Sequence, residues 1–142
     1  MSEKFIRKAS QAGVYYLPAT RRDTLEAAAA RVHLSPTLIN ISQGTHVGAL
    51  LKQLGETLNF PDWYGANFDA LHDCLTDPDW MPGKGLVLFL TGTASLHKGD
   101  PRGFATLIEV FQAAAADLNQ NGTPLWILFD SPATGIPVLP EA

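Results

Sequence analysis

The most informative part of the chain is residues 60–76, which read FPDWYGANFDALHDCLT. An aromatic-rich loop leads directly into a segment whose apolar residues have helical spacing. At about 100° per residue, one arc of a helix over residues 67–75 carries the apolar side chains of Phe68, Leu71, Cys74 and Leu75. Asp69, Asp73 and Thr76 fall on the opposite arc. The stretch therefore predicts a short amphipathic helix with an acidic face.

The acidic face of this helix belongs to a wider acidic region. Asp69 and Asp73 are one turn apart, a spacing at which like charges destabilise a helix by roughly 0.2–0.5 kcal/mol. No Lys or Arg occurs between Lys52 and Lys84, but six of the 14 acidic residues lie there, whereas the rest of the chain has 8 acidic and 10 basic residues. Such a local field can attract a cationic partner. The alternative is an acidic surface that only keeps the protein soluble.

Length and composition predict a compact protein of one domain. The chain has 142 residues, of which 46% are hydrophobic and 17% charged, as is typical of a globular domain. Its single cysteine excludes an internal disulfide, and together with a start that does not resemble a signal sequence it favours the reducing cytosol. The net charge of -4 argues against a nucleic-acid partner, and the apolar runs are far too short to span a membrane.

Apolar periodicity predicts alternating strands and helices. We expect strands over residues 14–17, 37–41, 86–90 and 125–129, and helices over residues 24–32, 45–58, 67–75 and 101–119. Asp23 or Thr24 is expected to cap the first helix, and Thr45 the second. The last two strands are uninterrupted apolar runs, which is typical of strands covered on both faces. This order predicts a single α/β domain with a mainly parallel sheet of about four strands packed with helices.

An enzymatic interpretation of the acidic helix rests on His72, Asp73 and Cys74, which are adjacent in sequence. Neighbours on a helix point about 100° apart, so His72 and Cys74 cannot act as base and nucleophile. Cys74 also lies on the apolar arc, where a free cysteine behaves as a small hydrophobe. Asp69 and His72 have a spacing that metal ligands use, but one helix supplies too few ligands. We therefore assign no catalytic residue, no metal site and no cofactor.

The glycine-containing segments do not form a phosphate-binding motif. Gly83-Lys84-Gly85 is too short for a phosphate loop, and no GxGxxG sequence follows a predicted strand. Gly44-Thr45, before a predicted helix, has the position of an anion site at a helix N-terminus. Capping of that helix by Thr45 explains the pair better.

Aromatic side chains frame the acidic helix on both sides. Trp63 and Tyr64 precede it beside Gly65, and Trp80 follows its far end. Trp and Tyr are enriched at the energetic centres of protein–protein interfaces. Tyr64 and Phe68 can instead pack into the core, whereas we expect Trp63 to be exposed. The segment therefore predicts a protein-binding surface that would suit a basic cleft.

Residues 60–75 are similar to the signature of the barstar family. The family's pattern is an apolar–Pro step, aromatic residues and Gly, followed by Asn-x-Asp-Ala-Leu-x-Asp-Cys-Leu, which stands here at residues 67–75. The resemblance extends from about residue 37 to residue 129 and includes the Val110-Phe111 step of a later helix. It implies a parallel sheet packed with helices, in agreement with the periodicity.

A domain organisation follows from the resemblance. Residues 36–130 would form the barstar-like domain, and residues 1–35 would add a strand–helix extension before it. Residues 131–142 contain three prolines, so we expect an extended C-terminal tail on the surface.

The resemblance also implies a function. Barstar-like proteins inhibit small, basic, secreted ribonucleases in a one-to-one complex, and the helix with its preceding loop fills the active site. Asp73 would then mimic a substrate phosphate, Asp69 would support it from the previous turn, and Trp63 would cover the catalytic cleft. The expected partner-binding residues are Trp63, Asp69, His72, Asp73, Thr76 and Trp80.

The chain departs from the family pattern at several positions. Trp63 replaces a tyrosine, His72 replaces a tryptophan that often precedes the key aspartate, and Gly85 replaces a proline. The acidic residue that follows the Val-Phe step in the family is Ala113 here, and Asp117 lies one turn later. The N-terminal extension and the absent acid at Ala113 favour a second interpretation, a non-inhibitory protein-interaction module on the same fold.

Overall fold

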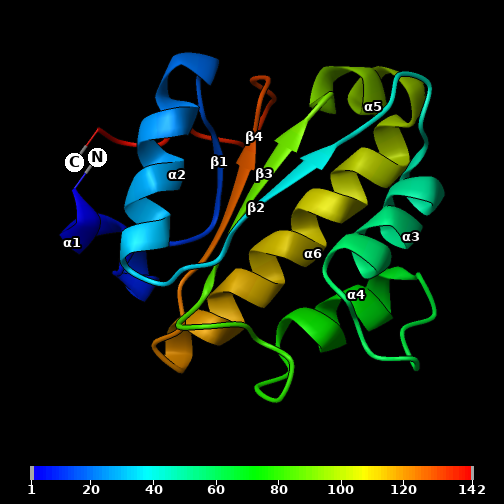
Figure 1. The fold of residues 1–142 in the computed structure, drawn as a ribbon. Helices are drawn as coiled ribbons and strands as arrows, with labels where there is room; N and C mark the ends of the chain where they lie inside the picture. Colours follow the sequence, from blue (N-terminus) through cyan, green and yellow to red (C-terminus); the bar gives the residue numbers. More distant parts are fainter. Residues whose placement is uncertain (1, 142) are drawn as a thin grey trace.

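The computed structural model describes residues 2–141, which form one β-sheet with helices on both faces (Figure 1). The strands are β1 (Val14–Tyr16), β2 (Pro36–Asn40), β3 (Leu86–Thr91) and β4 (Leu125–Phe129). The α-helices are α1 (Glu3–Ile6), α2 (Arg22–Arg31), α3 (Val47–Thr57), α4 (Phe68–Leu75), α5 (Thr93–Gly99) and α6 (Pro101–Gln120), and short 3₁₀ turns cover Ala9–Gln11 and Ala19–Arg21. The predicted α/β class with a four-stranded parallel sheet is confirmed.

The order of the strands across the sheet is β1-β4-β3-β2, and every neighbouring pair is parallel. Parallel neighbours need crossover connections, which helices provide here. α2 connects β1 to β2, α3 and α4 connect β2 to β3, and α5 and α6 connect β3 to β4. Figure 1 shows α2 on one side of the sheet and α3, α4 and α6 on the other. Helix α4 therefore belongs to the layer that contains the long helix α6.

The central strands β3 and β4 bury side chains on both faces, which explains their continuous apolar sequences. The side chains that face the layer of α3 to α6 are Leu86, Leu88, Leu90, Leu125, Ile127 and Phe129. The side chains that face α1 and α2 are Val87, Phe89, Trp126 and Leu128. Each of these ten side chains is at most 3% exposed. Both layers of helices are therefore needed to keep the sheet away from water.

Residues 2–35 supply the edge strand β1 and the layer that covers the second face of the sheet. β1 pairs with β4 in parallel, so this strand is continuous with the strands that follow. Leu25, Ala28 and Ala29 of α2 are buried in the same cluster as the apolar side chains of β3 and β4. The indole Nε1 of the buried Trp126 donates a hydrogen bond of 2.7 Å to the carbonyl of Ile6. The N-terminal segment is thus bonded to the middle of the sheet.

The C-terminal tail differs from the expected surface segment, because two of its apolar side chains are buried. Leu139 is 1% exposed and Ile136 is 7% exposed. The amide of Leu139 donates to the carbonyl of Tyr16, and the amide of Tyr16 donates to the carbonyl of Pro137. The guanidinium of Arg21 also donates to the carbonyl of Leu139 at 2.6 Å. The tail therefore pairs with β1 at that edge of the sheet.

The expected cap of α3 by Thr45 is wrong, because a carboxylate from another part of the chain takes its place. The amide of Val47 at the start of α3 donates to Oδ2 of Asp100 at 3.0 Å. Oδ1 of the same residue accepts from the amide of Gly103 in the first turn of α6, also at 3.0 Å. One carboxylate therefore joins the beginnings of two helices.

The beginnings of α2 and α5 also differ from the sequence-based expectation. The N-cap of α2 is Arg21, without a side-chain hydrogen bond, so neither Asp23 nor Thr24 is the cap. Helices α1 and α5 were not predicted. The cap of α5 comes from Asp130, whose carboxylate accepts from the amide and the hydroxyl of Thr93. That cap is contributed by a residue far along the chain, which local sequence rules do not detect.

We expect Asp100→Asn to make the folding stability less sensitive to acid. The amides of Val47 and Gly103 lower the pKa of Asp100, because they stabilise its charged form. A carboxylate of this kind contributes stability above its unfolded pKa of about 3.9 and loses that contribution as the pH falls through the folded value.

Urea unfolding at about pH 5 and about pH 3 measures this effect. The parent chain should lose more stability between the two values than Asp100→Asn does. Glu26→Gln changes an exposed acid on α2 and should behave like the parent. Equal losses in all three proteins would contradict the assignment of Asp100 as a charged double cap.

Candidate functional site

Helix α4 is fixed at both ends by its own sequence. The side chain of Asn67 accepts a hydrogen bond of 2.8 Å from the amide of Ala70, which is the bond that an N-cap residue makes. At the other end, the hydroxyl of Thr76 donates to the carbonyl of His72 at 2.8 Å. The position of the helix in the chain therefore agrees with the prediction of residues 67–75.

The apolar arc of α4 is buried, as predicted. Leu71, Cys74 and Leu75 are 0% exposed, and Phe68 is half-buried against the same core. Full burial of one leucine side chain contributes about 1.5–3 kcal/mol. Rotation of α4 about its axis would expose these side chains, so their burial fixes the direction of the opposite arc.

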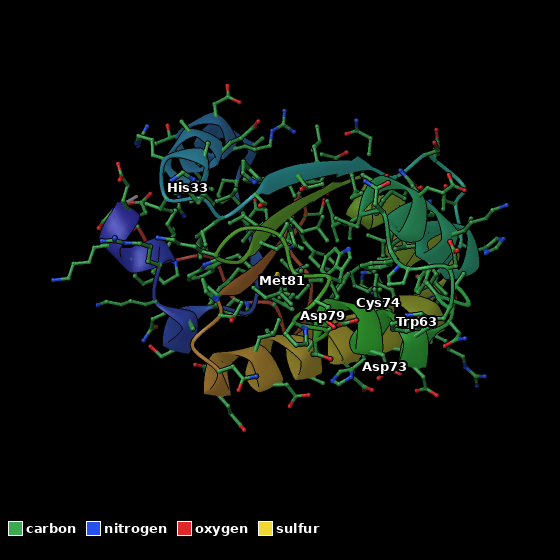
Figure 2. The ribbon with its side chains drawn as sticks, turned by 60° about the horizontal axis from the view of Figure 1, so that its bottom comes forward. His33, Trp63, Asp73, Cys74, Asp79 and Met81 are labelled. Atoms are coloured by element: carbon green, nitrogen blue, oxygen red, sulfur yellow. The ribbon has the colours of Figure 1, made fainter. Side chains whose placement is uncertain are left out.

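The acidic arc of α4 faces solvent. The side chain of Asp73 is 67% exposed, Asp69 is exposed, and Thr76 is half-buried. Figure 2 shows Asp73 and Trp63 on the same side of the molecule, away from His33 near α2. Asp69 and Asp73 share the exposed arc of α4, and Trp63 lies on the same side of the molecule as Asp73. We call this surface the α4 face and define it by Trp63, Asp69, His72, Asp73 and Thr76.

The loop before α4 is held by a cluster of three aromatic rings. Phe60 lies between Tyr64 and Trp80, with ring centroids 4.8 Å from each and edge-on geometry. The hydroxyl of Tyr64 donates to the carbonyl of Leu51 at 2.6 Å, and Nε1 of Trp80 donates to the carbonyl of Leu58 at 2.9 Å. Trp80, which we also expect at the partner-binding surface, is half-buried, and its indole nitrogen donates inside the protein. Its ring therefore also supports the loop before α4.

Trp63 lies in this loop but differs from its neighbours in exposure. Its side chain is 55% exposed, whereas Tyr64 and Phe68 pack against the core. The predicted exposure of Trp63 is confirmed, and Tyr64 and Phe68 take the alternative of packing against the core. A large exposed ring on a rigid loop is a suitable anchor for a protein partner, because little rotamer entropy is lost on binding.

The close approach of α3 to Tyr64 depends on Gly55, which lies on α3. A Cβ atom at Gly55 would lie 2.6 Å from the ring of Tyr64. The ring has little freedom to move, because Tyr64 is held by Phe60 and by the carbonyl of Leu51. Sequence analysis missed this glycine, although a glycine inside a helical pattern is a signal of close packing.

We expect Gly55→Ala to destabilise the protein by about 1–3 kcal/mol, because the added methyl group overpacks the site. Helix propensity alone would give the opposite sign. Gly99→Ala on α5 is the matched control, since no atom lies within 4 Å of a Cβ there. Chemical denaturation measures both. A Gly55→Ala protein as stable as the parent would show that the loop is not held by this contact.

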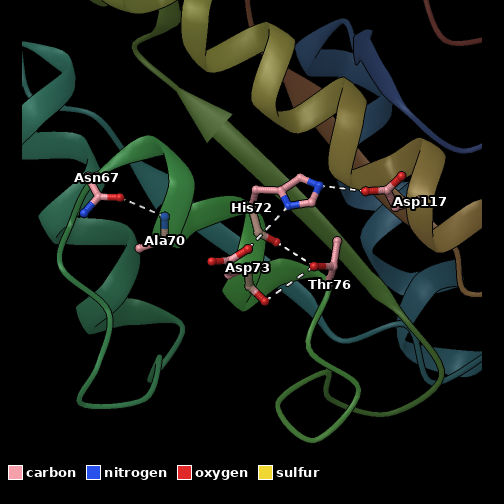
Figure 3. A network of polar contacts seen from close by, with 6 residues as sticks. All are labelled: Asn67, Ala70, His72, Asp73, Thr76 and Asp117. Atoms are coloured by element: carbon pink, nitrogen blue, oxygen red, sulfur yellow. Dashed lines mark hydrogen bonds and ion pairs between the residues drawn. The ribbon is translucent and has the colours of Figure 1, made fainter.

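His72 has a partner that the sequence did not reveal. Its Nε2 lies 2.7 Å from Oδ2 of Asp117 on α6, and its Nδ1 lies 3.8 Å from Oδ1 of Asp73 (Figure 3). Asp117 was noted as the acid one turn after Ala113, and its contact with His72 joins α4 to α6. Asp117 therefore lies beside the α4 face, with its side chain 55% exposed.

Cys74 lies on the buried arc of α4, in an environment that keeps its thiol protonated. Burial raises the pKa of the Cys74 thiol to about 11, and the negative charges of Asp73 and Asp77 add to the shift. A thiol that is buried and protonated is a poor nucleophile. Within residues 2–141, no group of three or more His, Cys, Asp or Glu side chains is arranged to hold a metal ion.

We expect the thiol of Cys74 in the folded protein to be protected from a disulfide reagent such as DTNB at about pH 8, because the reactive thiolate is almost absent below its pKa. In urea the thiol becomes accessible and should react at the rate of an ordinary cysteine, which serves as the control. Fast reaction of the folded protein would contradict the burial of Cys74.

Most of the chain matches a known protein family. Residues 35–130 match the family model described as Barstar (barnase inhibitor). The match covers more than half of the chain, so the chain belongs to the barstar family. No curated protein matches the sequence. The matched segment contains β2 to β4 with α4 and its loop, and the family description is that of an inhibitor rather than an enzyme.

In the part of the chain from residue 2 to residue 141, every helix is too short or too polar to cross a bilayer. The longest is α6, with 20 residues, and it carries charged residues at Arg102, Glu109 and Asp117.

Proposed function

We propose that this chain inhibits a small basic ribonuclease by placing the α4 face in the active site of the enzyme. The observation that carries the proposal is the solvent-facing carboxylate of Asp73 on a helix whose orientation is fixed by burial of its other side. A site that binds RNA phosphates offers several cationic donors, and a carboxylate held in place forms strong charge-assisted hydrogen bonds with them. Membership of the barstar family, described as an inhibitor of barnase, supports the same function.

The other residues of the α4 face have supporting roles in this proposal. Asp69 adds negative charge one turn before Asp73, and Trp63 covers the edge of the catalytic cleft. Thr76 contacts the partner at the end of the helix, and Trp80 acts indirectly by holding the loop. The complex contains one inhibitor and one nuclease and requires no cofactor. We place the inhibitor in the cytosol, where the single thiol of the chain remains reduced.

We expect Asp73→Ala to weaken binding to the nuclease by roughly 2–5 kcal/mol, mainly through faster dissociation. Barnase is the first enzyme to test, because the family description names it. Inhibition of RNA cleavage gives the affinity, and surface plasmon resonance separates the two rate constants. Added salt should slow association of the parent chain, because it screens the attraction of the acidic region for a basic enzyme.

Glu26→Ala is the matched control for this measurement. It removes an exposed acid from α2, on the other side of the sheet, and should leave the affinity unchanged. If the parent chain inhibits a ribonuclease and Asp73→Ala inhibits it equally well, the proposed mode of binding is wrong.

A second candidate function is a protein-interaction module that does not inhibit a nuclease. Ala113 favours it, because the family places an acidic residue there, and Asp117 one turn later is already bonded to His72. A partner without ribonuclease activity, bound through Trp63 and Asp73, would support this candidate. Inhibition of barnase or of another small basic ribonuclease at equimolar inhibitor would exclude it.

A further inference from the structure

The imidazole ring of His72 lies between two carboxylates from different helices. Asp117 on α6 approaches Nε2 at 2.7 Å, and Asp73 on α4 lies 3.8 Å from Nδ1 (Figure 3). The first distance is that of a strong charge-assisted hydrogen bond, whereas the second is too long for a hydrogen bond. The two nitrogen atoms of the ring therefore have different roles.

The contact with Asp117 determines where the proton of the neutral ring lies. An ionised carboxylate can only accept hydrogen bonds, so Nε2 must carry the proton that is donated to Asp117. In a neutral imidazole the other nitrogen then has a free lone pair and is an acceptor. Nδ1 of His72 and Oδ1 of Asp73 are thus two neighbouring acceptors, and the 3.8 Å between them shows that they do not bond to each other.

We propose that His72 Nδ1 and Asp73 Oδ1 together accept hydrogen bonds from one guanidinium group of the partner, and that Asp117 is the positioning residue that keeps His72 in the accepting tautomer. A donor nitrogen about 2.9 Å from each acceptor fits between atoms that are 3.8 Å apart. The fork of an arginine offers N–H bonds in two directions and suits such a pair. The side chains of His72 and Asp73 are 33% and 67% exposed, so a partner can reach both.

This inference deepens the proposed function and rests on it for the identity of the partner. The hydrogen bonds themselves need only a guanidinium group, so the α4 face would form them with any surface that presents an arginine. It also gives His72 a role that a tryptophan at the same position does not have, because the indole ring has a donor and no acceptor. His72 and Asp117 would therefore determine which cationic partner is preferred.

The tautomer can be tested in the free protein by ¹⁵N NMR of the imidazole of His72. We expect a protonated Nε2 and an unprotonated Nδ1. Asp117→Asn removes the charged acceptor and should give a mixture of tautomers. A proton on Nδ1 in the parent chain would overturn the proposal, and no partner is needed for this measurement.

Guanidinium recognition can be tested by titration of the full chain with a hepta-arginine peptide at about pH 8. The resonance of Nδ1 should move as the peptide binds, and the change should saturate as the peptide is added. If resonances near Asp73 shift while Nδ1 does not, the paired acceptor is excluded.

Two substitutions at His72 separate the two nitrogen positions. His72→Gln can reach Asp117 but has no acceptor at the place of Nδ1, so affinity for the peptide should fall about three- to tenfold. His72→Asn has its carbonyl oxygen near the place of Nδ1 and should lose clearly less. Glu26→Gln on α2 is the control. Equal losses for Gln and Asn would overturn the proposal.

Ribonuclease inhibition is measured separately from peptide binding. A chain that binds the peptide through Nδ1 but inhibits no ribonuclease would contradict the proposed function and leave the acceptor pair intact. A chain that inhibits a ribonuclease while Nδ1 remains unaffected by the peptide would support the proposed function and contradict the acceptor pair. The two failures are therefore distinguishable.

Discussion

The burial of Leu71, Cys74 and Leu75 connects the stability of α4 to the direction of its charges. A helix of eight residues is too short to be stable in water by itself, so α4 exists because the core covers its apolar arc. The same contact turns Asp69 and Asp73 towards solvent. A substitution in the core can therefore alter binding without touching a partner, because the position of both carboxylates follows from how well that arc is packed.

Much of the fold could be predicted, because burial leaves a clear pattern in the sequence. β4 has the expected bounds at residues 125–129, since a strand covered on both faces must be apolar throughout. Helix beginnings were less predictable. Local rules selected Thr45 for α3, whereas the folded chain brings Asp100 to that position and Asp130 to the beginning of α5. A cap of this kind is a tertiary contact, so spacing along the chain does not reveal it.

The candidate site shows the same division between local and tertiary information. Helical spacing correctly placed Asp73 outside and Cys74 inside, and the family resemblance indicated which arc to consider. The pairing of His72 with Asp117 and the inward hydrogen bond of Trp80 depend on how α4 and its loop pack against α6 and α3. The substitution at His72, visible as a departure from the family pattern, marked the place where the structure later showed a new contact.

The layer formed by residues 2–35 and the C-terminal tail has a consequence for what counts as the folding unit. Apart from residue 35, these segments lie outside the matched residues 35–130, yet they cover Val87, Phe89, Trp126 and Leu128. Burial of each such side chain contributes about 1.5–3 kcal/mol. The contribution of four of them is similar in size to the free energy of unfolding of a whole domain, which is roughly 5–15 kcal/mol. A fragment limited to the matched residues would therefore expose these four side chains to water, so the part that defines the family is not the whole of the core.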